Sequence, residues 1–316
     1  MHDFLQSLTF SFSITGPIFV VLGLGVYLRR IGLINDNFID VGSKLVFNVT
    51  LPALLFLSIS QTHIADSANM SLVVLGLVGT LVAYLMLELL AAALVPKRED
   101  RGVVVQGGFR SNMGIIGLAY CVNAYGDAGL VAASLYLGLV TILFNILAVI
   151  TLNRSLNHRG GVASTLKGIT RNPLIISIVA ALFVAGFEWE IPTLLIQSGG
   201  YFAQMTLPLA LICTGASLDF RALRADFRSA VISAVCKLMI VPLLLIAAGI
   251  AVGFKGLELG VLALMSSAPS AAASYIMVRA MGGNSALAAN IIVLTTMGSL
   301  LTTSVLMMVL HSFALL

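Results

Sequence analysis

The sequence predicts an all-α polytopic membrane protein, and three observations carry this prediction. The chain of 316 residues is 59% hydrophobic and only 9% charged, whereas soluble domains carry about 25% charged residues. Its mean hydropathy of +1.07 is typical of a chain that is surrounded by lipid. Apolar stretches of about 20 residues, the length that crosses the hydrocarbon core of a bilayer, recur along the whole chain. We therefore expect about ten transmembrane helices and no separate soluble domain.

Ten segments qualify as spans, and one long polar connection divides them into two groups of five. The connection covers residues 153–171 (NRSLNHRGGVASTLKGITR). We accordingly predict a first five-helix repeat at 1–152, a cytoplasmic connecting loop at 153–171 and a second five-helix repeat at 172–316. The expected spans are 10–30, 38–60, 70–95, 102–124, 127–152, 172–188, 191–217, 228–253, 257–281 and 284–311.

The two halves resemble each other at a constant offset of 156 residues, without a gap. Internal duplication of a hydrophobic unit is typical of secondary transporters, whose related halves enclose a site near the bilayer midplane. The pairs are Pro17 with Pro173, Thr50-Leu51-Pro52 with Thr206-Leu207-Pro208, Gly126 with Gly282, and Ala132-Ala133 with Ala288-Ala289.

The basic residues predict the orientation of the chain in the membrane. Fourteen of them lie in or beside alternate loops, and only Lys255 lies on the opposite side. The positive-inside rule places the basic side in the cytoplasm and both termini outside it. Because each repeat has five helices, an odd number, the two repeats must be inverted. The fourteen are Arg29, Arg30, Lys44, Lys97, Arg98, Arg101, Arg154, Arg159, Lys167, Arg171, Arg221, Arg224, Arg228 and Arg279.

The fourth and ninth spans each contain a polar interruption, and the offset pairs the two interruptions. Residues 110–114 (RSNMG) fall on residues 266–270 (SSAPS). A proline removes a backbone donor and disrupts a helix. Breaks at matching places in two repeats indicate a binding site, because half-helix N-termini attract anions. The alternative is a pair of kinks that serve helix packing. The candidate substrate-binding residues are Arg110, Ser111, Asn112, Gly114, Ser267, Pro269 and Ser270.

The two Thr-Leu-Pro elements add four candidates at mid-depth in the second and seventh spans. Proline is expected to kink each helix there, which places Asn48, Thr50, Gln204 and Thr206 near the interruptions. Their side chains could face the substrate. The alternative is that each threonine bonds only to a backbone carbonyl that the proline leaves free.

Three ionisable residues lie within the expected spans: Glu88, Arg110 and Lys237. Charge at membrane depth is costly and therefore suggests a function. Glu88 and Lys237 could form a buried pair that fixes helix packing, or Glu88 could titrate and couple proton movement. Arg110 either extends to the cytoplasmic surface or binds an anionic substrate, because arginine suits bidentate carboxylate recognition.

The sequence contains no motif that indicates an enzyme. We find no catalytic triad, no HExxH and no phosphate-binding loop, and no histidines at metal-ligand spacing. We expect no cofactor and no nucleic-acid partner, and no removable signal peptide. Cys121, Cys213 and Cys236 lie in apolar segments as expected for small core residues.

Five stretches together resemble the auxin efflux carrier family over the whole chain. The resemblance implies a panel domain (helices 1, 2, 6 and 7), a crossover domain (helices 3–5 and 8–10), substrate binding where helices 4 and 9 cross, and elevator-like alternating access. In the plant members helix 4 carries Asn-Pro at the crossing, whereas this chain has Asn112-Met113. The stretches are GPIFVVLGLGVYLRRIGLI, LVFNVTLPALLF, FRSNMGIIGLAY, KLMIVPLLL and SSAPSAAASYIMV.

The resemblance also implies a substrate class, since bacterial members are similar to malonate and malate carriers. We therefore expect a secondary transporter of a small organic anion in the bacterial cytoplasmic membrane. Three competing functions are a channel, an intramembrane enzyme and a non-transporting sensor. A channel needs a continuous polar lining, and one pair of breaks favours a carrier. Coupling to H⁺ or Na⁺, uniport or export of another weak acid, and homodimer formation remain open.

Overall fold

The computed structural model describes residues 2–61, 70–156, 173–218 and 226–316. Within these ranges the chain is helical, and its only extended pairing is one isolated bridge. The prediction of an all-α polytopic membrane protein is therefore confirmed. Most of the predicted connecting loop 153–171 lies outside the described residues, as do Arg159, Lys167, Arg171, Arg221 and Arg224.

Each of the ten predicted spans corresponds to a helix or to a helix in two parts. Six helical stretches are long and apolar enough to cross a membrane, and Pro173–Gly186 and Gly256–Ser267 are shorter apolar helices. The first half consists of α1(His2–Arg30), α2(Asp36–Leu45), η1(Val46–Thr50), α3(Leu51–Ser60), α5(Met70–Leu94), α6(Arg98–Phe109), η2(Met113–Gly117) and α7(Leu118–Leu156). The second half consists of α9(Pro173–Gly186), α10(Thr193–Ser217), α11(Phe227–Val235), η4(Cys236–Ile240), α12(Val241–Val252), α13(Gly256–Ser267), α14(Ala273–Ala280) and α15(Ser285–Ser312).

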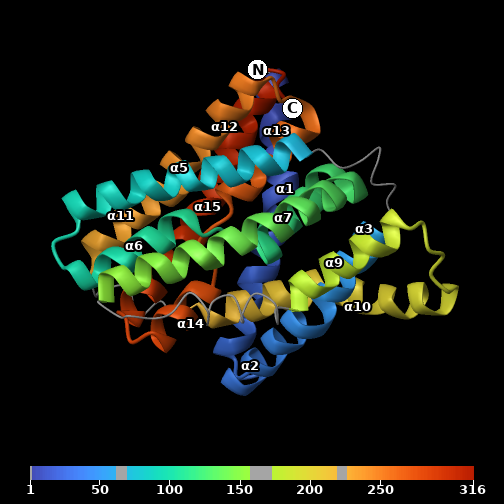
Figure 1. Ribbon diagram of the computed structural model, residues 1–316, viewed down its shortest axis with the longest axis horizontal. Coiled ribbons are helices and arrows are strands. Elements are labelled where there is room, and N and C mark those ends of the chain that lie inside the picture. Colours follow the sequence, from blue (N-terminus) through green and yellow to red (C-terminus); the bar gives the residue numbers. More distant parts are fainter. Residues whose placement is uncertain (1, 62–69, 157–172, 219–225) are drawn as a thin grey trace.

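The helices pack in two groups. Helix α10 packs on α1, α2 and α3, and α3 also packs on α9. In the other group α6 packs on α5, α7 and α11, and α13 packs on α7, α12 and α15. Figure 1 shows α3, α9 and α10 gathered below α7 on the right, with α5, α6 and α11 on the left. Helix α1 also packs on α15 of the second group, so the two groups share a boundary. The panel and crossover domains that the family resemblance implies stay a prediction.

Two internal prolines follow π-helical turns, η1 and η4. Pro52 and Pro242 stand at the second residue after these turns. The wide turns have i to i−5 bonds, from Leu51 N–H to the Val46 carbonyl and from Val241 N–H to the Cys236 carbonyl. A π turn makes room for the proline ring, which in an α-helix would clash with the carbonyl four residues earlier. By contrast, α10 continues as an α-helix through Pro208, so the two Thr-Leu-Pro elements differ.

The glycine pair of the predicted repeat has a positive φ in both halves. Gly126 has a φ of 59° and Gly282 a φ of 72°, values that residues with a Cβ rarely adopt. Each glycine follows a broken helix and precedes a long one, α7 after Gly126 and α15 after Gly282. Residues paired at the 156-residue offset thus play the same structural role.

The gapless register fails at the helix breaks. The extended residues that pair are Ser111 and Ser270, whereas the 156-residue offset places Gly114 on Ser270. The physical reason is that the chain from the break to the glycine turn is longer in the first half. There it includes the turn η2, which is π-helical and uses more residues per turn than an α-helix.

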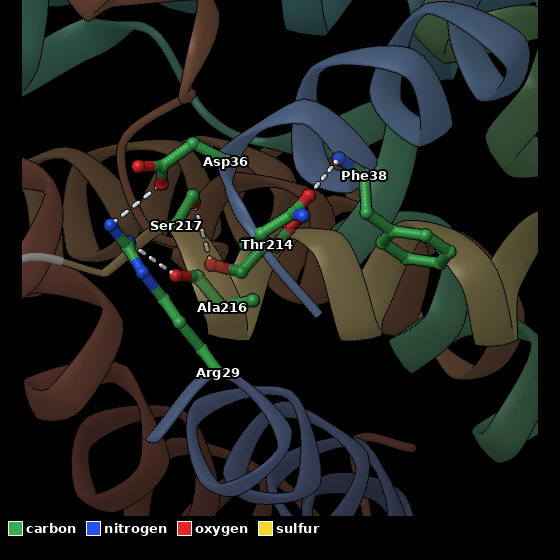
Figure 2. A network of polar contacts seen from close by, with 7 residues as sticks. Arg29, Asp36, Phe38, Thr214, Ala216 and Ser217 are labelled. Carbon is green, nitrogen blue, oxygen red and sulfur yellow. Dashed lines mark hydrogen bonds and ion pairs between the residues drawn. The ribbon is translucent and has the colours of Figure 1, made fainter. Parts of the chain in front are cut away.

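Two sets of polar contacts join predicted cytoplasmic loops to one another or to the end of a neighbouring helix. Lys97 pairs with Asp226 at 3.3 Å, and the Asn284 amide donates to Asp100 (3.0 Å) and Asp226 (2.8 Å). Figure 2 shows Arg29 reaching from the end of α1 to Asp36 and to the Ala216 carbonyl at the end of α10. The positive guanidinium there compensates the negative end of α10.

The loop before α13 meets the C-terminal segment at another place in the molecule. Gly256 N–H donates to the Leu315 carbonyl at 2.8 Å, and Figure 1 shows both termini near α12 and α13. This contact agrees with the distribution of basic residues, which predicts that both termini and the loop between the eighth and ninth spans lie on the same side of the membrane. The prediction that this side is outside the cytoplasm stays a prediction.

Candidate functional site

The breaks in helices 4 and 9 lie against each other and form a short antiparallel crossing. Helix α6 ends at Phe109 and α13 ends at Ser267. Between the half-helices, Asn112 N–H donates to the Pro269 carbonyl at 2.7 Å, and Ala271 N–H donates to the Arg110 carbonyl at 3.0 Å. This exchange satisfies backbone groups that the interrupted helices leave without partners.

Serine side chains stabilise the crossing further. Ser270 Oγ donates to the Gly107 carbonyl at 2.6 Å, and Ser270 N–H donates to Thr295 Oγ1 at 3.1 Å. Ser267 is almost fully buried and its hydroxyl bonds to the Leu264 carbonyl within its own helix. Both serines of helix 9 that the sequence suggested as substrate-binding residues therefore make hydrogen bonds within the protein. The sequence alone did not distinguish this structural role from substrate binding.

Lys237 lies directly at the crossing, although it belongs to the eighth predicted span. Its side chain is fully buried. The Nζ group donates to Ser111 Oγ and to the Ser266 carbonyl, the latter at 2.7 Å. One ammonium thus joins the extended residue of helix 4 to the last turn of α13.

The alternative in which Glu88 pairs with Lys237 does not hold. Glu88 accepts a hydrogen bond from Thr151 Oγ1 at 2.5 Å and pairs with Arg154 at 3.4 Å. These partners lie on α7, so Glu88 joins α5 to α7. The sequence could not reveal this, because Lys237 and Glu88 lie at similar predicted depths on equivalent helices but face different neighbours.

Arg110 caps the end of α6, and its guanidinium stays inside the protein. Only 8% of the residue is exposed. Its Nη2 donates to Asn145 Oδ1 at 2.7 Å, and Nη1 contacts Met277 Sδ at 3.4 Å. The alternative in which Arg110 extends to the aqueous surface does not hold. Sequence reasoning missed Asn145, whose signal is a single amide in the apolar stretch TILFNILAV.

Thr50 carries a buried hydroxyl without a hydrogen-bond partner in the described part of the chain, and Asn112 is a second nearly buried polar residue. Asn112 is 7% exposed, and Thr50 Oγ1 is fully buried. A buried polar group without a partner costs about 1–3 kcal/mol, so such groups need a physical reason such as an absent ligand. The two residues belong to adjacent elements, since Gly114 of η2 approaches Leu51, the neighbour of Thr50.

The other candidates from helices 2 and 7 differ from Thr50. Thr206 Oγ1 donates to the Phe202 carbonyl of its own helix at 3.1 Å. This is not the carbonyl that Pro208 leaves free, which is that of Gln204. The Asn48 amide donates to the Lys44 carbonyl at 2.8 Å, and Asn48 is exposed. Gln204 is also exposed. Of these four residues, Thr50 alone has a buried side-chain oxygen without a hydrogen-bond partner in the described chain.

The crossing carries two buried cationic side chains and no carboxylate partner for either among the described residues. Ion pairs elsewhere in the described chain include Arg29–Asp36, Lys97–Asp226 and Arg154–Glu88. Arg110 and Lys237 instead bind neutral amide, hydroxyl and carbonyl oxygens. Their positive charge is therefore not cancelled locally, and an anion at the crossing would be attracted.

Comparison with known proteins identifies the family of this chain. The sequence model of the membrane transport protein family matches residues 13–163 and 161–307. These two segments cover most of the chain. The chain belongs to this family. It is the auxin efflux carrier family that the five quoted stretches resemble.

The curated relatives of this auxin efflux carrier family member include two archaeal proteins. A protein of Methanothermobacter thermautotrophicus, described as an uncharacterized transporter, is 27% identical over 80% of this chain and 83% of its own length. Another protein described as an uncharacterized transporter, from Methanocaldococcus jannaschii, is 23% identical over 82% of this chain and 86% of its own length. This family member is thus a multi-pass membrane transport protein similar to transporters over most of its length.

Proposed function

We propose that the protein is a secondary transporter of a small organic anion, a mono- or dicarboxylate such as malonate or malate, across the cytoplasmic membrane. The single observation that carries this proposal is the uncompensated positive charge of Arg110 and Lys237 at the crossing. Buried cations without carboxylate partners favour an anionic ligand.

The substrate would bind beside Asn112, where half-helix η2 begins. The first N–H groups of a helix have no intrahelical partner and carry the positive end of the dipole. The Thr50 hydroxyl is buried and lacks a partner within the described chain, and Asn112 is the residue that precedes η2. A carboxylate could accept hydrogen bonds from these groups, while Arg110 adds charge from the other side of the break.

The two packing groups support elevator-like alternating access. The crossing belongs to the crossover group, and Thr50 belongs to the panel group. Movement of the crossover group along the panel would carry the crossing from one side of the membrane to the other. We place the basic loops in the cytoplasm and both termini outside it, as the positive-inside rule requires.

Counterflow in proteoliposomes tests this function. Purified protein is reconstituted with unlabelled malonate or malate inside, and uptake of the labelled compound is followed with other carboxylates as competitors. Saturable and competed exchange is expected. Folded protein that exchanges none of these anions would contradict the proposal. In that case binding without flux would favour the second candidate, a membrane sensor on the same fold.

A further inference from the structure

The ammonium of Lys237 occupies a position with the chemistry of a cation site. It contacts a hydroxyl oxygen, Ser111 Oγ, and a backbone carbonyl oxygen, that of Ser266. Both oxygens belong to the broken helices. Oxygen atoms of this kind are the ligands that hard cations prefer in proteins.

The helix dipole makes this position favourable for positive charge. Ser266 lies in the last turn of α13, where carbonyl groups have no intrahelical donor. The C-terminal end of a helix carries partial negative charge. In carriers with discontinuous helices, unwound carbonyls and half-helix C-terminal ends are the groups that coordinate sodium.

A π-helical turn in the eighth span contains Lys237. Lys237 lies in the π-helical turn η4, which precedes Pro242. Single π turns occur frequently at functional sites. No carboxylate is paired with Lys237 among the described residues, so its hydrogen-bond partners in the broken helices compensate its burial.

We propose that Lys237 is a tethered replacement for a coupling cation. Its ammonium fills the oxygen cluster between the half-helices, joins them and excludes Na⁺ by occupancy and like-charge repulsion. Exchange therefore proceeds without sodium. This inference rests on the proposed carrier function and addresses sodium coupling, one of the alternatives that the sequence leaves open.

The first experiment uses the unchanged protein. Thermal unfolding in detergent is measured in NaCl, KCl and choline chloride at equal ionic strength, and counterflow is measured in the same three salts. Equal unfolding temperatures and equal exchange rates are expected. A sodium-specific rise in the unfolding temperature, or exchange that requires sodium, would overturn the proposal.

The second experiment compares Lys237→Ala with Lys237→Met. Alanine removes the charge and leaves space for an ion, whereas methionine removes the charge and fills the space. We expect Na⁺ or Li⁺ to raise the unfolding temperature of the alanine variant by several degrees and to leave the methionine variant unchanged. Absence of an ion effect on the folded alanine variant would contradict a cation site.

The readouts separate this inference from the proposed function. Unfolding temperatures report the cation site whether or not the protein transports anything. Loss of all flux in every salt would contradict the carrier function and leave the ion comparison valid. If neither variant can be purified in folded form, the comparison of salts on the unchanged protein decides.

Discussion

Single polar residues in otherwise apolar helices set the chemistry of this protein. Arg110 and Lys237 are both buried and bind neutral oxygens, Asn145 Oδ1 in one case and Ser111 Oγ with the Ser266 carbonyl in the other. Glu88 differs, because Arg154 compensates its charge at the interface of α5 and α7. At this scale the structure separates side chains that can attract an anion from a carboxylate that holds two helices together.

Arg110→Ala is expected to raise the anion concentration for half-maximal exchange by about 10- to 100-fold. Hydrogen bonds to charged groups contribute about 1.5–3 kcal/mol, which corresponds to this factor. Arg110→Lys keeps the positive charge but lacks the planar guanidinium. Its anion concentration for half-maximal exchange should therefore lie between that of the unchanged protein and that of Arg110→Ala. Counterflow measures the effect, and Arg154→Ala is the control that should exchange normally. Unchanged kinetics in folded Arg110→Ala would remove this residue from the site.

Glu88→Gln is expected to preserve exchange and to cost less than about 1 kcal/mol of stability. Its partner Arg154 has a side chain that is 71% exposed, and such exposed ion pairs contribute about 0–1 kcal/mol. Glutamine can still accept the hydrogen bond from Thr151. Uptake driven by a pH gradient is the decisive measurement. If Glu88→Gln lost uptake driven by a pH gradient but kept normal exchange, proton coupling would be assigned to Glu88.

At the scale of helices, close approach of backbones distinguishes structural glycines from incidental ones. Gly25 of α1 faces the backbone of Ile212, and Gly215 of α10 faces the backbone of Leu22. A Cβ on either glycine would overlap a carbonyl oxygen. Small residues of this kind let membrane helices pack closely. Gly23, also on α1, has no other atom near its missing Cβ.

Gly215→Ala and Gly25→Ala should each destabilise the fold by about 1–3 kcal/mol, because extra volume at a tight contact forces the helices apart. Gly23→Ala is the matched control. It should be neutral or stabilising by up to about 1 kcal/mol, since alanine is the better helix former. Thermal unfolding in detergent compares the three variants. Equal unfolding temperatures would show that α1 and α10 do not pack this closely.

The ends of three helices meet in a polar cluster whose stability depends on pH. Asn284 caps α15 by accepting from Leu287 N–H at 3.1 Å and donates to Asp100 and Asp226. The Asn284 amide, and then Lys97, hold the pKa of Asp226 below its usual value. Burial raises the pKa of Asp100. Stability from Asp226 is therefore present above its unfolded pKa and is lost as pH falls through its folded pKa.

Substitution of Asn284 tests this cluster. Asn284→Ala should cost at least about 1 kcal/mol through loss of the cap. Asn284→Asp keeps a cap acceptor but places a third carboxylate beside Asp100 and Asp226. The unfolding temperature of this variant should lie far below that of the unchanged protein at pH 7. On acidification this difference should shrink more than it does for the alanine variant, because protonation removes the repulsion between the carboxylates. Unfolding temperatures at pH 7 and pH 4.5 measure this, and parallel curves would contradict it.

At the scale of the whole molecule, the proposed elevator requires the panel and crossover groups to move relative to each other. Helices α1 and α15 contact across this boundary, where Thr15 Oγ1 and Ser304 Oγ are 2.8 Å apart. The three native cysteines are buried and free. They can be replaced by alanine to give a background for cross-linking.

Thr15→Cys with Ser304→Cys should stop counterflow when Hg²⁺ joins the two thiols, and a reducing thiol should restore it. Each single cysteine variant is a control that should retain exchange with Hg²⁺. Full exchange by completely cross-linked protein would contradict relative movement at this boundary. The same result would leave the anion site at the crossing unaffected.

The sequence by itself determined the class of the protein, its spans and the places where helices break. Low charge and long apolar stretches can be recognised from neighbouring residues alone. The same holds for Pro269 and the paired glycines Gly126 and Gly282, whose effects on the backbone are local. The resemblance to the auxin efflux carrier family added the two-domain grouping. The predictions of class, spans and breaks succeed because apolar length and the backbone limits of proline and glycine act locally, without reference to distant parts of the chain. The two-domain grouping stays a prediction.

Only the tertiary structure decided which polar side chains meet. It brought Lys237 of the eighth span to Ser111, gave Glu88 a different partner, and shifted the register of the two breaks. It also left Thr50 without a partner while Thr206 bonds its own helix. The physical reason is that rotation of each helix, altered locally by the π turns, selects the neighbours of a side chain, and sequence depth alone does not specify that rotation.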